Sequence, residues 1–525
     1  MGRPVEGRTA GQADRGVLAK QREARRDDPG TIDTVRDREG GTAPSAAGPV
    51  TGVRPASRLR ALGAFAERHW LIAVLLAAAT ALRVAVMIGY RPVLWFNDSF
   101  QYVSDAMQRT PGTERPSGYS VFLMVLQPLH SFAAVATVQH LMGLAAGLMI
   151  YAALRRRGLP DWGASLAALP VLFDAYQVQL EHLVMSDALF TFLVTAAVFL
   201  LCWRDRPSVL TAVAAGLLTG AAALVRTVGL PLLAVVAVCL LIRQAGWRRV
   251  LAGLAAGVLP VLAYAVWFHS VYGKFALTES DGPFLYSRVM AFAECSKVKP
   301  PENLQVLCDP RPPASRPITP EYPWTIGNPL YRVSSAPFTP KPSHMAGRFA
   351  LLAIERQPVD YLRVTAVDTA RTFGWDRSQD YPDPTTARQY QFTTWAQPIP
   401  NWANFNQAGK YQPHGRLSTL VNPTYARPLE VYQRYFYLRG AMLGVILLIG
   451  AAWVVYGRRR GAPGLLPWCI AAALIVEPAA TAGFSYRYIL AAVPAACLAA
   501  GLAFVSSRSG TRIVQSGHRP PSHPG

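Results

Sequence analysis

Residues 70–89 read Trp-Leu-Ile-Ala-Val-Leu-Leu-Ala-Ala-Ala-Thr-Ala-Leu-Arg-Val-Ala-Val-Met-Ile-Gly, an apolar run of 20 residues whose single charge is Arg83. An α-helix needs about 20 such residues to cross the hydrocarbon core of a membrane, with about 17 as the lower limit. This run therefore predicts a transmembrane helix. The charged fraction of the whole chain, 16%, agrees with a membrane protein, because in soluble proteins about a quarter of the residues are charged.

Further apolar blocks follow along the chain, and most of them are almost free of charge. Some reach the length of a span directly, and others need their flanking residues. They are residues 132–154, 159–173, 186–203, 208–225, 229–242, 249–269, 436–456, 464–482 and 486–505. Together with residues 70–89 they predict about ten transmembrane helices. The expected fold class is thus an all-α polytopic membrane bundle.

The arginines of the chain lie in a pattern that predicts the topology. The formal net charge is +21, and much of it gathers in every second short loop between spans, such as Arg155–Arg157 and Arg458–Arg460. This alternation follows the positive-inside rule, so we expect both termini to be cytoplasmic and the protein to lie in the plasma membrane. A basic chain can also bind nucleic acid, but no fold or aromatic-lined groove for that purpose accompanies the charge, and we expect no such partner.

The composition outside the apolar blocks divides the chain into parts. Residues 1–60 are rich in arginine, aspartate, glycine and alanine with almost no aromatic residues, which predicts a disordered cytoplasmic tail. The first apolar block comes after this charged segment, so we expect it to stay in place as an anchor. The further parts are an N-terminal bundle at 61–269 with its first outer loop at 90–131, an extracytoplasmic domain at 270–435, C-terminal transmembrane helices at 436–507 and a cytoplasmic tail at 508–525.

The segment 270–435 is rich in proline, tyrosine, tryptophan and phenylalanine, which predicts a folded domain of mixed secondary structure with many turns. Helical spacing appears at 346–353 and 359–373, with Pro358 placed to start the second helix. Cys295 and Cys308 fall in the same segment. Because the outer side is oxidising, we expect a disulfide between them, which contributes about 3 kcal/mol for a loop of this size.

Ionisable residues at the predicted spans gather toward the outer side. A charge inside the bilayer is costly, so it marks either a functional site or a side chain that reaches the headgroups. Taken one by one, the arginines could reach headgroups and Asp187 could sit at a helix N-terminus. Their shared depth instead predicts a cavity open to the outer leaflet. The residues are Arg83, Asp174, Glu181, Asp187, Arg226, His269, Glu477 and Arg487.

The first outer loop begins with the stretch Trp95-Phe-Asn-Asp-Ser-Phe-Gln-Tyr-Val-Ser-Asp-Ala106. Asp98 and Asp105 are seven residues apart, and in a helix they would lie on one face. Aromatic residues around them suit a short helix at the boundary between water and lipid. The loop continues with Arg115-Pro-Ser-Gly-Tyr119.

These stretches resemble the polyprenyl-phosphate-sugar-dependent glycosyltransferases of the GT-C class, near the protein mannosyltransferases and the aminoarabinose transferases. That class carries an acid in its first outer loop, here matched by Asp98, followed by a motif similar to Arg115–Tyr119. Four later stretches also resemble the class, at 183–190, 224–231, 355–362 and 484–490. The resemblance covers most of residues 65–505 in order and spacing. It departs at Asn97–Ser99, which lacks the second acid of the class.

The resemblance implies a membrane enzyme that moves a sugar from a polyprenyl-phosphate donor to an extracytoplasmic glycan, protein or lipid. Negative charge develops on the departing phosphate, so we predict that Arg226 and Arg487 bind the donor phosphate. We predict that Asp98 is the base that takes the acceptor proton, which implies inversion at the anomeric carbon. The residues predicted to orient the acceptor or to lie around these groups are Asp105, Glu181, Asp187, Arg115 and Tyr119.

Several alternatives stay open at this stage. Oxygen ligands alone would favour magnesium or manganese, but the chain has no Asp-x-Asp motif, so the need for a divalent cation is undecided. A flippase or transporter of lipid-linked sugars would bind the same headgroups with the same arginines. A membrane scaffold that displays residues 270–435 is a third interpretation. The sequence lacks a phosphate-binding Gly-rich loop and a Gly-x-Ser-x-Gly motif, which argues against an ATP-driven pump and a serine hydrolase.

Overall fold

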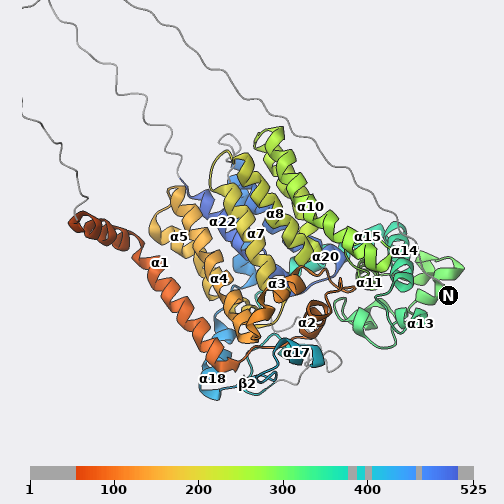
Figure 1. Ribbon diagram of the computed structural model, residues 1–525. Coiled ribbons are helices and arrows are strands. Elements are labelled where there is room, and N and C mark those ends of the chain that lie inside the picture. The colour runs from red at the N-terminus through yellow and green to blue at the C-terminus, as the bar shows by residue number, and fades with distance from the viewer. Residues whose placement is uncertain (1–54, 377–386, 397–404, 457–463, 506–525) are drawn as a thin grey trace, which may run out of the picture. The chain divides into compact units, whose positions relative to one another are not determined.

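The computed structural model of the chain describes residues 55–376, 387–396, 405–456 and 464–505 (Figure 1). Within these ranges the protein is almost entirely helical, and the sheet found there is one pair of two-residue strands. The predicted tails at 1–60 and 508–525 lie outside the described residues, except that helix α1 (Pro55–Gly89) begins within the first of them.

The apolar blocks between residues 132 and 272 fold into successive helices, of which α4, α7 and α8 run side by side (Figure 1). A helix is the expected form for such blocks, because it satisfies every backbone polar group away from water. Ser131 and Ser208 cap α4 and α8 by accepting backbone N–H bonds. The helices are α4 (Phe132–Arg156), α5 (Asp161–Phe173), α6 (Ala175–His182), α7 (Ser186–Cys202), α8 (Val209–Val225), α9 (Leu230–Ile242) and α10 (Trp247–Tyr272).

Helices α8 and α10 approach each other closely because both carry glycines at the contact. A Cβ atom at Gly216 would lie 2.0 Å from the carbonyl oxygen of Gly253, which is closer than atoms can approach. Small residues of this kind let two backbones pack together where the hydrophobic effect between helices is weak, as it is in lipid. The pairing fixes the end of α8, and Arg226 follows directly after it.

Three of the described helices are long and apolar enough to cross a membrane: Glu67–Gly89, Phe132–Arg156 and Trp247–Tyr272. A bent pair, Pro423–Tyr435 with Gly440–Val455, makes a fourth if it is counted as one span. The other apolar helices in the described ranges have 10–17 residues. The count of about ten spans therefore stays a prediction, although each predicted block coincides with a helix or a pair of helices.

The first outer loop holds two short helices, α2 (Ser99–Gln108) and α3 (Gly118–Leu126), followed by a single 3-10 turn η1 (Gln127–Leu129). Helix α3 begins against the end of α8. A Cβ atom at Gly118 would lie 2.4 Å from the carbonyl oxygen of Leu224, so the glycine lets the loop sit directly beside the residues that precede Arg226. The motif that contains Gly118 thus brings the first outer loop to the α8–α9 turn.

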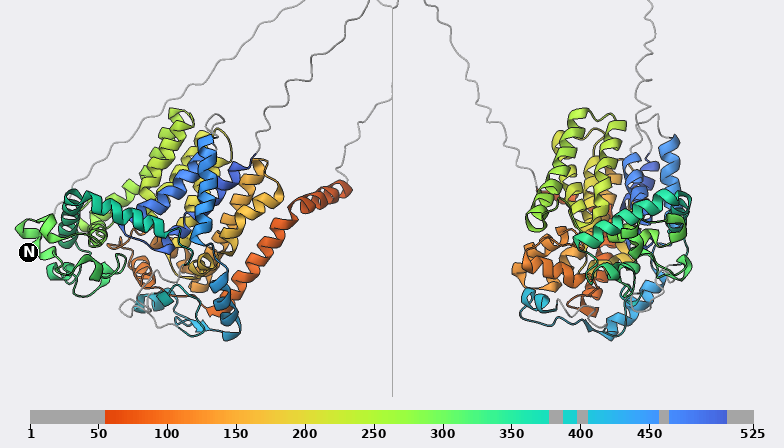
Figure 2. Two further views of the ribbon diagram at one scale, coloured as in Figure 1. Left: turned by 180° about the vertical axis from the view of Figure 1, so that it is seen from behind. Right: turned by 90° about the vertical axis from the view of Figure 1, so that its right-hand side faces the viewer.

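The first part of the predicted extracytoplasmic domain forms a small core of its own, and its elements gather in one group (Figure 2). Helix α15 begins at Pro358 as the sequence predicts, and a disulfide joins Cys295 to Cys308. Instead of mixed structure, this part has only helices and 3-10 turns. The elements are α11 (Asp281–Val289), α12 (Cys295–Val298), η3 (Glu302–Leu307), η4 (Pro313–Ser315), η5 (Tyr322–Trp324), α13 (Leu330–Val333), α14 (Pro340–Arg356) and α15 (Pro358–Arg371).

The second part of the same segment returns to the first outer loop and packs into the main core. Its strand β2 (Leu420–Val421) pairs antiparallel with β1 (Tyr90–Arg91), and its helices are α17 (Phe405–Tyr411) and α18 (Pro423–Tyr435). The indole of Trp95 donates a hydrogen bond to the carbonyl of Leu417 at 2.7 Å. The segment 270–435 therefore contributes to two cores, and its second part supports the loop that carries Asp98.

The last predicted span, 486–505, is divided into two helices rather than one. Helix α21 (Tyr486–Leu490) is separated by two residues from α22 (Val493–Ala503), in which Pro494 occupies the first turn. Proline suits a helix start because it has no N–H to donate. The break leaves Arg487 on a short separate helix beside α20 (Leu465–Thr481), while α19 (Gly440–Tyr456) precedes them.

Candidate active site

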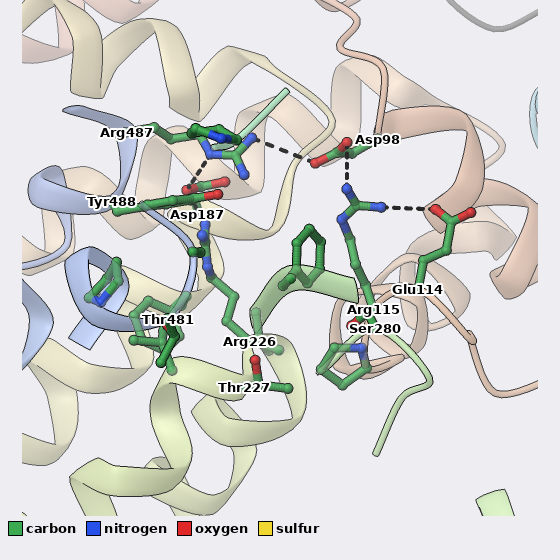
Figure 3. A pocket seen from close by; sticks show the side chains of 18 of the residues that line it. Asp98, Glu114, Arg115, Asp187, Arg226, Thr227, Ser280, Thr481, Arg487 and Tyr488 are labelled. Carbon is green, nitrogen blue, oxygen red and sulfur yellow. Dashed lines mark hydrogen bonds and ion pairs between the residues drawn. The ribbon is translucent and has the colours of Figure 1, made fainter. Parts of the chain in front are cut away.

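A cavity of about 640 Å³ lies where the first outer loop, the α8–α9 turn, the ends of α20 and α21, and the first part of the outer segment meet. Asp98, Asp187, Arg226 and Arg487, which come from four separate stretches of sequence, all line it, and Arg115 lines it as well (Figure 3). The structure therefore brings together the predicted base, both predicted phosphate-binding arginines and two of the residues expected around them.

Asp98 precedes the first residue of α2, yet its carboxylate makes no capping bond to the helix. The hydroxyl of Ser99 instead accepts the backbone N–H of Phe96 at 2.9 Å. Asp98 Oδ1 accepts a hydrogen bond from Arg115 Nη2 at 2.9 Å, and Oδ2 lies 3.6 Å from Arg487 Nη1. The side chain of Asp98 is thus directed at the cavity and does not cap the start of α2.

Asp187 and Arg226 form an ion pair on the opposite side of the cavity. Asp187 lies in the first turn of α7, whose N-cap residue is Met185, so the positive end of that helix also favours its negative charge. Arg226 has an extended backbone where α8 ends, and its guanidinium lies over the ring of Tyr488, 5.0 Å from the ring centre. The break between α8 and α9 therefore allows Arg226 to turn into the cavity.

Arg487 lies between the two acids and is weakly bonded to both. Its Nη1 is 3.6 Å from Asp98 Oδ2, and its Nε is 3.6 Å from Asp187 Oδ1. Its hydrogen bond is a long one of 3.5 Å to the hydroxyl of Tyr390, and the buried Nε has no hydrogen-bond acceptor. Only 9% of Arg487 is exposed. Leaving donors of a buried guanidinium unpaired is costly, so this position favours an anion.

The acids and arginines of the cavity alternate in one chain of contacts. Glu114 pairs with Arg115 at 3.2 Å, Arg115 with Asp98, Arg487 with both Asp98 and Asp187, and Asp187 with Arg226 (Figure 3). Three positive and three negative charges are close to balance, which limits the cost of burying them. An entering phosphate would compete with the carboxylates for the same guanidinium groups.

Three of the residues predicted to lie around the reacting groups do not line this cavity. Glu181 is fully buried in a pair with Arg83, because that arginine turns into the bundle rather than toward headgroups. The hydroxyl of Tyr119 donates to Gln139 Oε1 at 2.7 Å within the core.

Asp105 is the third. It does not line the cavity and accepts a hydrogen bond from Gln101 Nε2 at 2.7 Å. The seven-residue spacing from Asp98 does not bring the two acids together, because seven residues rise about 10 Å along a helix axis.

Sequence reasoning missed other groups at the cavity. Glu114 holds Arg115 from the side opposite Asp98, and burial raises the pKa of its carboxyl group. Tyr488 lies beneath both Arg226 and Arg487, with its ring centre 5.0 and 5.2 Å from the two guanidinium carbons. Both missed residues are direct neighbours of a predicted arginine in the sequence, which is the signal that could have found them. Glu477, which had no assigned role, also lines the cavity.

The side chains that could act as metal ligands at the cavity do not favour a metal ion. Asp98 and Asp187 are each paired with two arginines. Across the part of the chain that the structure describes, no group of three or more histidine, cysteine, aspartate or glutamate side chains could hold a metal. Magnesium and calcium ions need several oxygen ligands, so we derive no step through a metal.

No family model matches the sequence, and no curated protein does. Among solved structures, the chain is similar to the protein O-mannosyltransferase Pmt1–Pmt2 complex of S. cerevisiae bound to the sugar donor, at 18% identity over 43% of this chain and 36% of that one, with a TM-score of 0.32.

It is also similar to an oligosaccharyltransferase of Archaeoglobus fulgidus, at 13% identity over 83% of this chain and 50% of that one, with a TM-score of 0.41. A third similar structure is ArnT of Cupriavidus metallidurans bound to undecaprenyl phosphate, at 14% identity over 81% of this chain and 77% of that one, with a TM-score of 0.35. The chain thus spans about a third of the mannosyltransferase chain and half of the oligosaccharyltransferase chain. These are glycosyltransferases of the class that the sequence motifs resemble, but likenesses of this size carry no inference about activity.

Proposed function

We propose that this protein is a membrane glycosyltransferase that moves a sugar from a polyprenyl-phosphate donor to an acceptor on the outer side of the membrane. The observation that carries the proposal is the state of Arg487. Its guanidinium is buried at a cavity, faces two carboxylates at 3.6 Å and has a donor without an acceptor. A phosphate oxygen would supply the missing acceptor, because arginine binds phosphate through parallel N–H bonds.

The walls of the cavity support a donor that is both charged and apolar. The lining divides into charged side chains, among them the three arginines, and apolar ones, among them Leu474 and Pro478 of α20 and Ala491 next to α21. An isoprenoid chain attached to a phosphate has this same division. We therefore assign the phosphate to Arg487, with Arg226 as a second contact, and the lipid chain to the α20–α21 wall.

The reaction follows from the positions of the charged groups. The acceptor hydroxyl oxygen forms a bond with the anomeric carbon, and the bond from that carbon to the phosphate oxygen breaks. The electron pair of the broken bond leaves with the lipid phosphate, where Arg487 and Arg226 stabilise the added negative charge. The acceptor proton passes to Asp98, which later releases it to water. A single displacement of this kind inverts the configuration at the anomeric carbon.

Arg115 is a positioning residue in this scheme. It holds Asp98 Oδ1 at 2.9 Å and is itself held by Glu114 at 3.2 Å. A donor phosphate at Arg487 would satisfy its unpaired Nε and compete with Asp98 for the same guanidinium, so that the other oxygen of Asp98 becomes available to the acceptor hydroxyl. Donor binding would thus prepare the base for the acceptor hydroxyl.

A flippase or transporter of lipid-linked sugars is the alternative, since it would use the same arginines. The two functions differ in what Asp98 does. A base is needed only where a covalent bond forms, and Asp98 faces the cavity with one oxygen held by Arg115 and the other 3.6 Å from Arg487. This asymmetry favours the transferase.

The test measures sugar transfer by the purified protein in lipid nanodiscs with a panel of polyprenyl-phosphate sugars. We expect D98N to reduce consumption of the donor by about 100- to 10,000-fold, the usual contribution of a general base, while donor binding is retained. D105N is the matched control, because Asp105 is a buried acid of the same outer loop that does not face the cavity.

Normal transfer by D98N would show that Asp98 is not the base. Donor binding and translocation without consumption of any donor by the unaltered protein would favour the transporter. Inverted configuration in the product, read by NMR, is required by the single displacement, and retention would overturn it.

A further inference from the structure

One wall of the cavity is aromatic and comes from the first part of the outer segment. Trp324 and Phe284 both line the cavity, and Phe338 packs behind them. The ring of Trp324 lies 4.6 Å from that of Phe338 and 6.4 Å from that of Phe284, between ring centres. We call these three residues the aromatic wall. Trp324 keeps 40% of its surface exposed although its neighbours are packed.

The backbone that carries Trp324 is firmly held. Tyr322, two residues earlier, is fully buried and donates to Asp309 Oδ2 at 2.6 Å. The side chain of Asn328 donates to the carbonyl of Tyr322 at 2.8 Å and accepts from the N–H of Leu330 at 2.8 Å. Such support fixes the backbone from which the indole projects before a ligand arrives, which lowers the cost of binding.

A single side chain, that of Arg115, lies between Trp324 and the proposed base, Asp98. The guanidinium carbon of Arg115 is 5.5 Å from the centre of the Trp324 ring, and its Nη2 is 2.9 Å from Asp98 Oδ1. In Figure 3, Arg115, Glu114 and Ser280 gather below Asp98. A ligand that stacks on the exposed part of the Trp324 ring would therefore lie beside the guanidinium of Arg115, which holds Asp98.

We propose that the aromatic wall is the acceptor subsite and that it takes a carbohydrate, whose ring stacks on Trp324. That the bound carbohydrate is the acceptor rests on the proposed transferase function. That this wall binds a carbohydrate does not. A sugar ring has weakly positive C–H bonds on its face, which suit the negative face of an indole. Its rim of hydroxyls both donates and accepts hydrogen bonds, which matches a carboxylate and a guanidinium together.

Two other occupants fit the wall less well. An exposed tryptophan often anchors a protein at the membrane surface, but charged residues, Arg115 and Glu114, line the same part of the cavity as Trp324. An extended peptide would need backbone donors or a strand edge to pair with, and neither strand of the described residues lines the cavity.

The experiment measures ligand binding without any donor. Protein in nanodiscs free of glycoside detergents is mixed with methyl glycosides of common hexoses and pentoses, and saturation transfer to the sugar ring protons is recorded by NMR. We expect binding of at least one glycoside, weakened about fivefold or more by W324A, in the range of an aromatic contact, and largely restored in W324F. Thermal melting checks that each variant is folded.

The matched control is W375A. Trp375 is 61% exposed and has the guanidinium of Arg439 5.6 Å from its ring centre, nearly the environment of Trp324, but it does not line the cavity. We expect W375A to bind the glycosides as the unaltered protein does. Equal losses in both variants would mean non-specific adsorption to exposed rings and would overturn the proposal.

The proposal also fails if no glycoside binds, or if a short serine–threonine peptide binds in a manner that depends on Trp324 while the sugars do not. This result is separate from the fate of the transferase, because it involves neither donor nor turnover. If D98N and the donor panel establish transfer, W324A should raise the KM for a carbohydrate acceptor about fivefold and leave the KM for the donor unchanged.

Discussion

Two groups of buried acids and arginines lie in the same helical bundle, and they differ in how completely the arginine is bonded. Arg83 donates from Nε and Nη2 to Glu181 at 2.8 and 3.0 Å and from Nη1 to the carbonyl of Leu172 at 2.9 Å. Arg487 has one hydrogen bond within the described residues, a long one of 3.5 Å to Tyr390, and two carboxylates at 3.6 Å. The first pair is closed, whereas the second has room for another anion.

The surroundings of the two groups differ in the same way. Gly143 lies so close to Glu181 that a Cβ atom there would be 1.9 Å from Oε1, and His140 fills the remaining side. Nothing can enter. Arg487 instead lines a cavity of about 640 Å³. Depth in the membrane therefore identifies both groups as unusual, but only the degree of bonding separates a group that holds the fold from one that can bind a ligand.

The largest effect on stability is expected from breaking the pair of Arg83 and Glu181. E181Q leaves the charge of Arg83 buried without its partner, and breaking such a pair costs about 3–5 kcal/mol. We expect a fall of this size in the free energy of unfolding, measured by detergent titration, with transfer per folded molecule unchanged. A stable E181Q variant that fails to transfer sugar would contradict the conclusion that the Arg83–Glu181 pair holds the fold and takes no part in the reaction.

A smaller effect is expected from R487K, which keeps the charge but loses the planar fork of donors. A hydrogen bond to a charged group contributes about 1.5–3 kcal/mol, so the KM for the donor should rise about 10- to 100-fold while stability changes little. R439K is the control, since Arg439 also lies over two rings, those of Tyr437 and Trp375, but outside the cavity. An unchanged KM for the donor in R487K would show that the donor phosphate does not bind to Arg487.

Much of the architecture could be predicted because apolar blocks and helices coincide. The blocks at 132–154 and 208–225 became α4 and α8 almost residue for residue, since each is apolar along its length and begins at a serine cap. The division of the last span could be suspected only from Pro494. The return of residues 387–396 and 405–435 to the first outer loop could not be predicted, because pairs such as Trp95 and Leu417 are far apart in sequence.

The site was predictable where the residue type itself forces a location. Arg226 and Arg487 end or begin apolar blocks, so their charges had to lie near the membrane boundary, and both line the cavity. The arrangement around them was not predictable in the same way. Glu181 and Asp187 have the same charge at nearly the same depth, and the direction of two neighbouring helices decides that one pairs with Arg83 and the other with Arg226.

A pH-dependent effect concerns Asp105, a buried acid that belongs to neither group and has the amide of Gln101 as its hydrogen-bond donor. Burial raises the pKa of Asp105 from 3.8 to about 7. The folded protein therefore holds this proton where the unfolded chain has lost it, and stability falls as the pH rises from about 4 to about 7, by at most about 1.4 kcal/mol per unit.

D105N removes this titration. Its stability relative to the unaltered protein should therefore increase across the same pH range and level off above it, as measured by thermal melting at each pH. A constant difference would show that Asp105 has its ordinary acidity in the folded protein. A carboxylate paired with arginine, such as Glu181, should give the opposite trend, with its stabilisation lost as the pH falls, because the pKa of that group is held low by Arg83 and His140 against the effect of burial. Melting curves of D105N and E181Q over one pH series thus compare a buried acid without an arginine partner to one with such a partner.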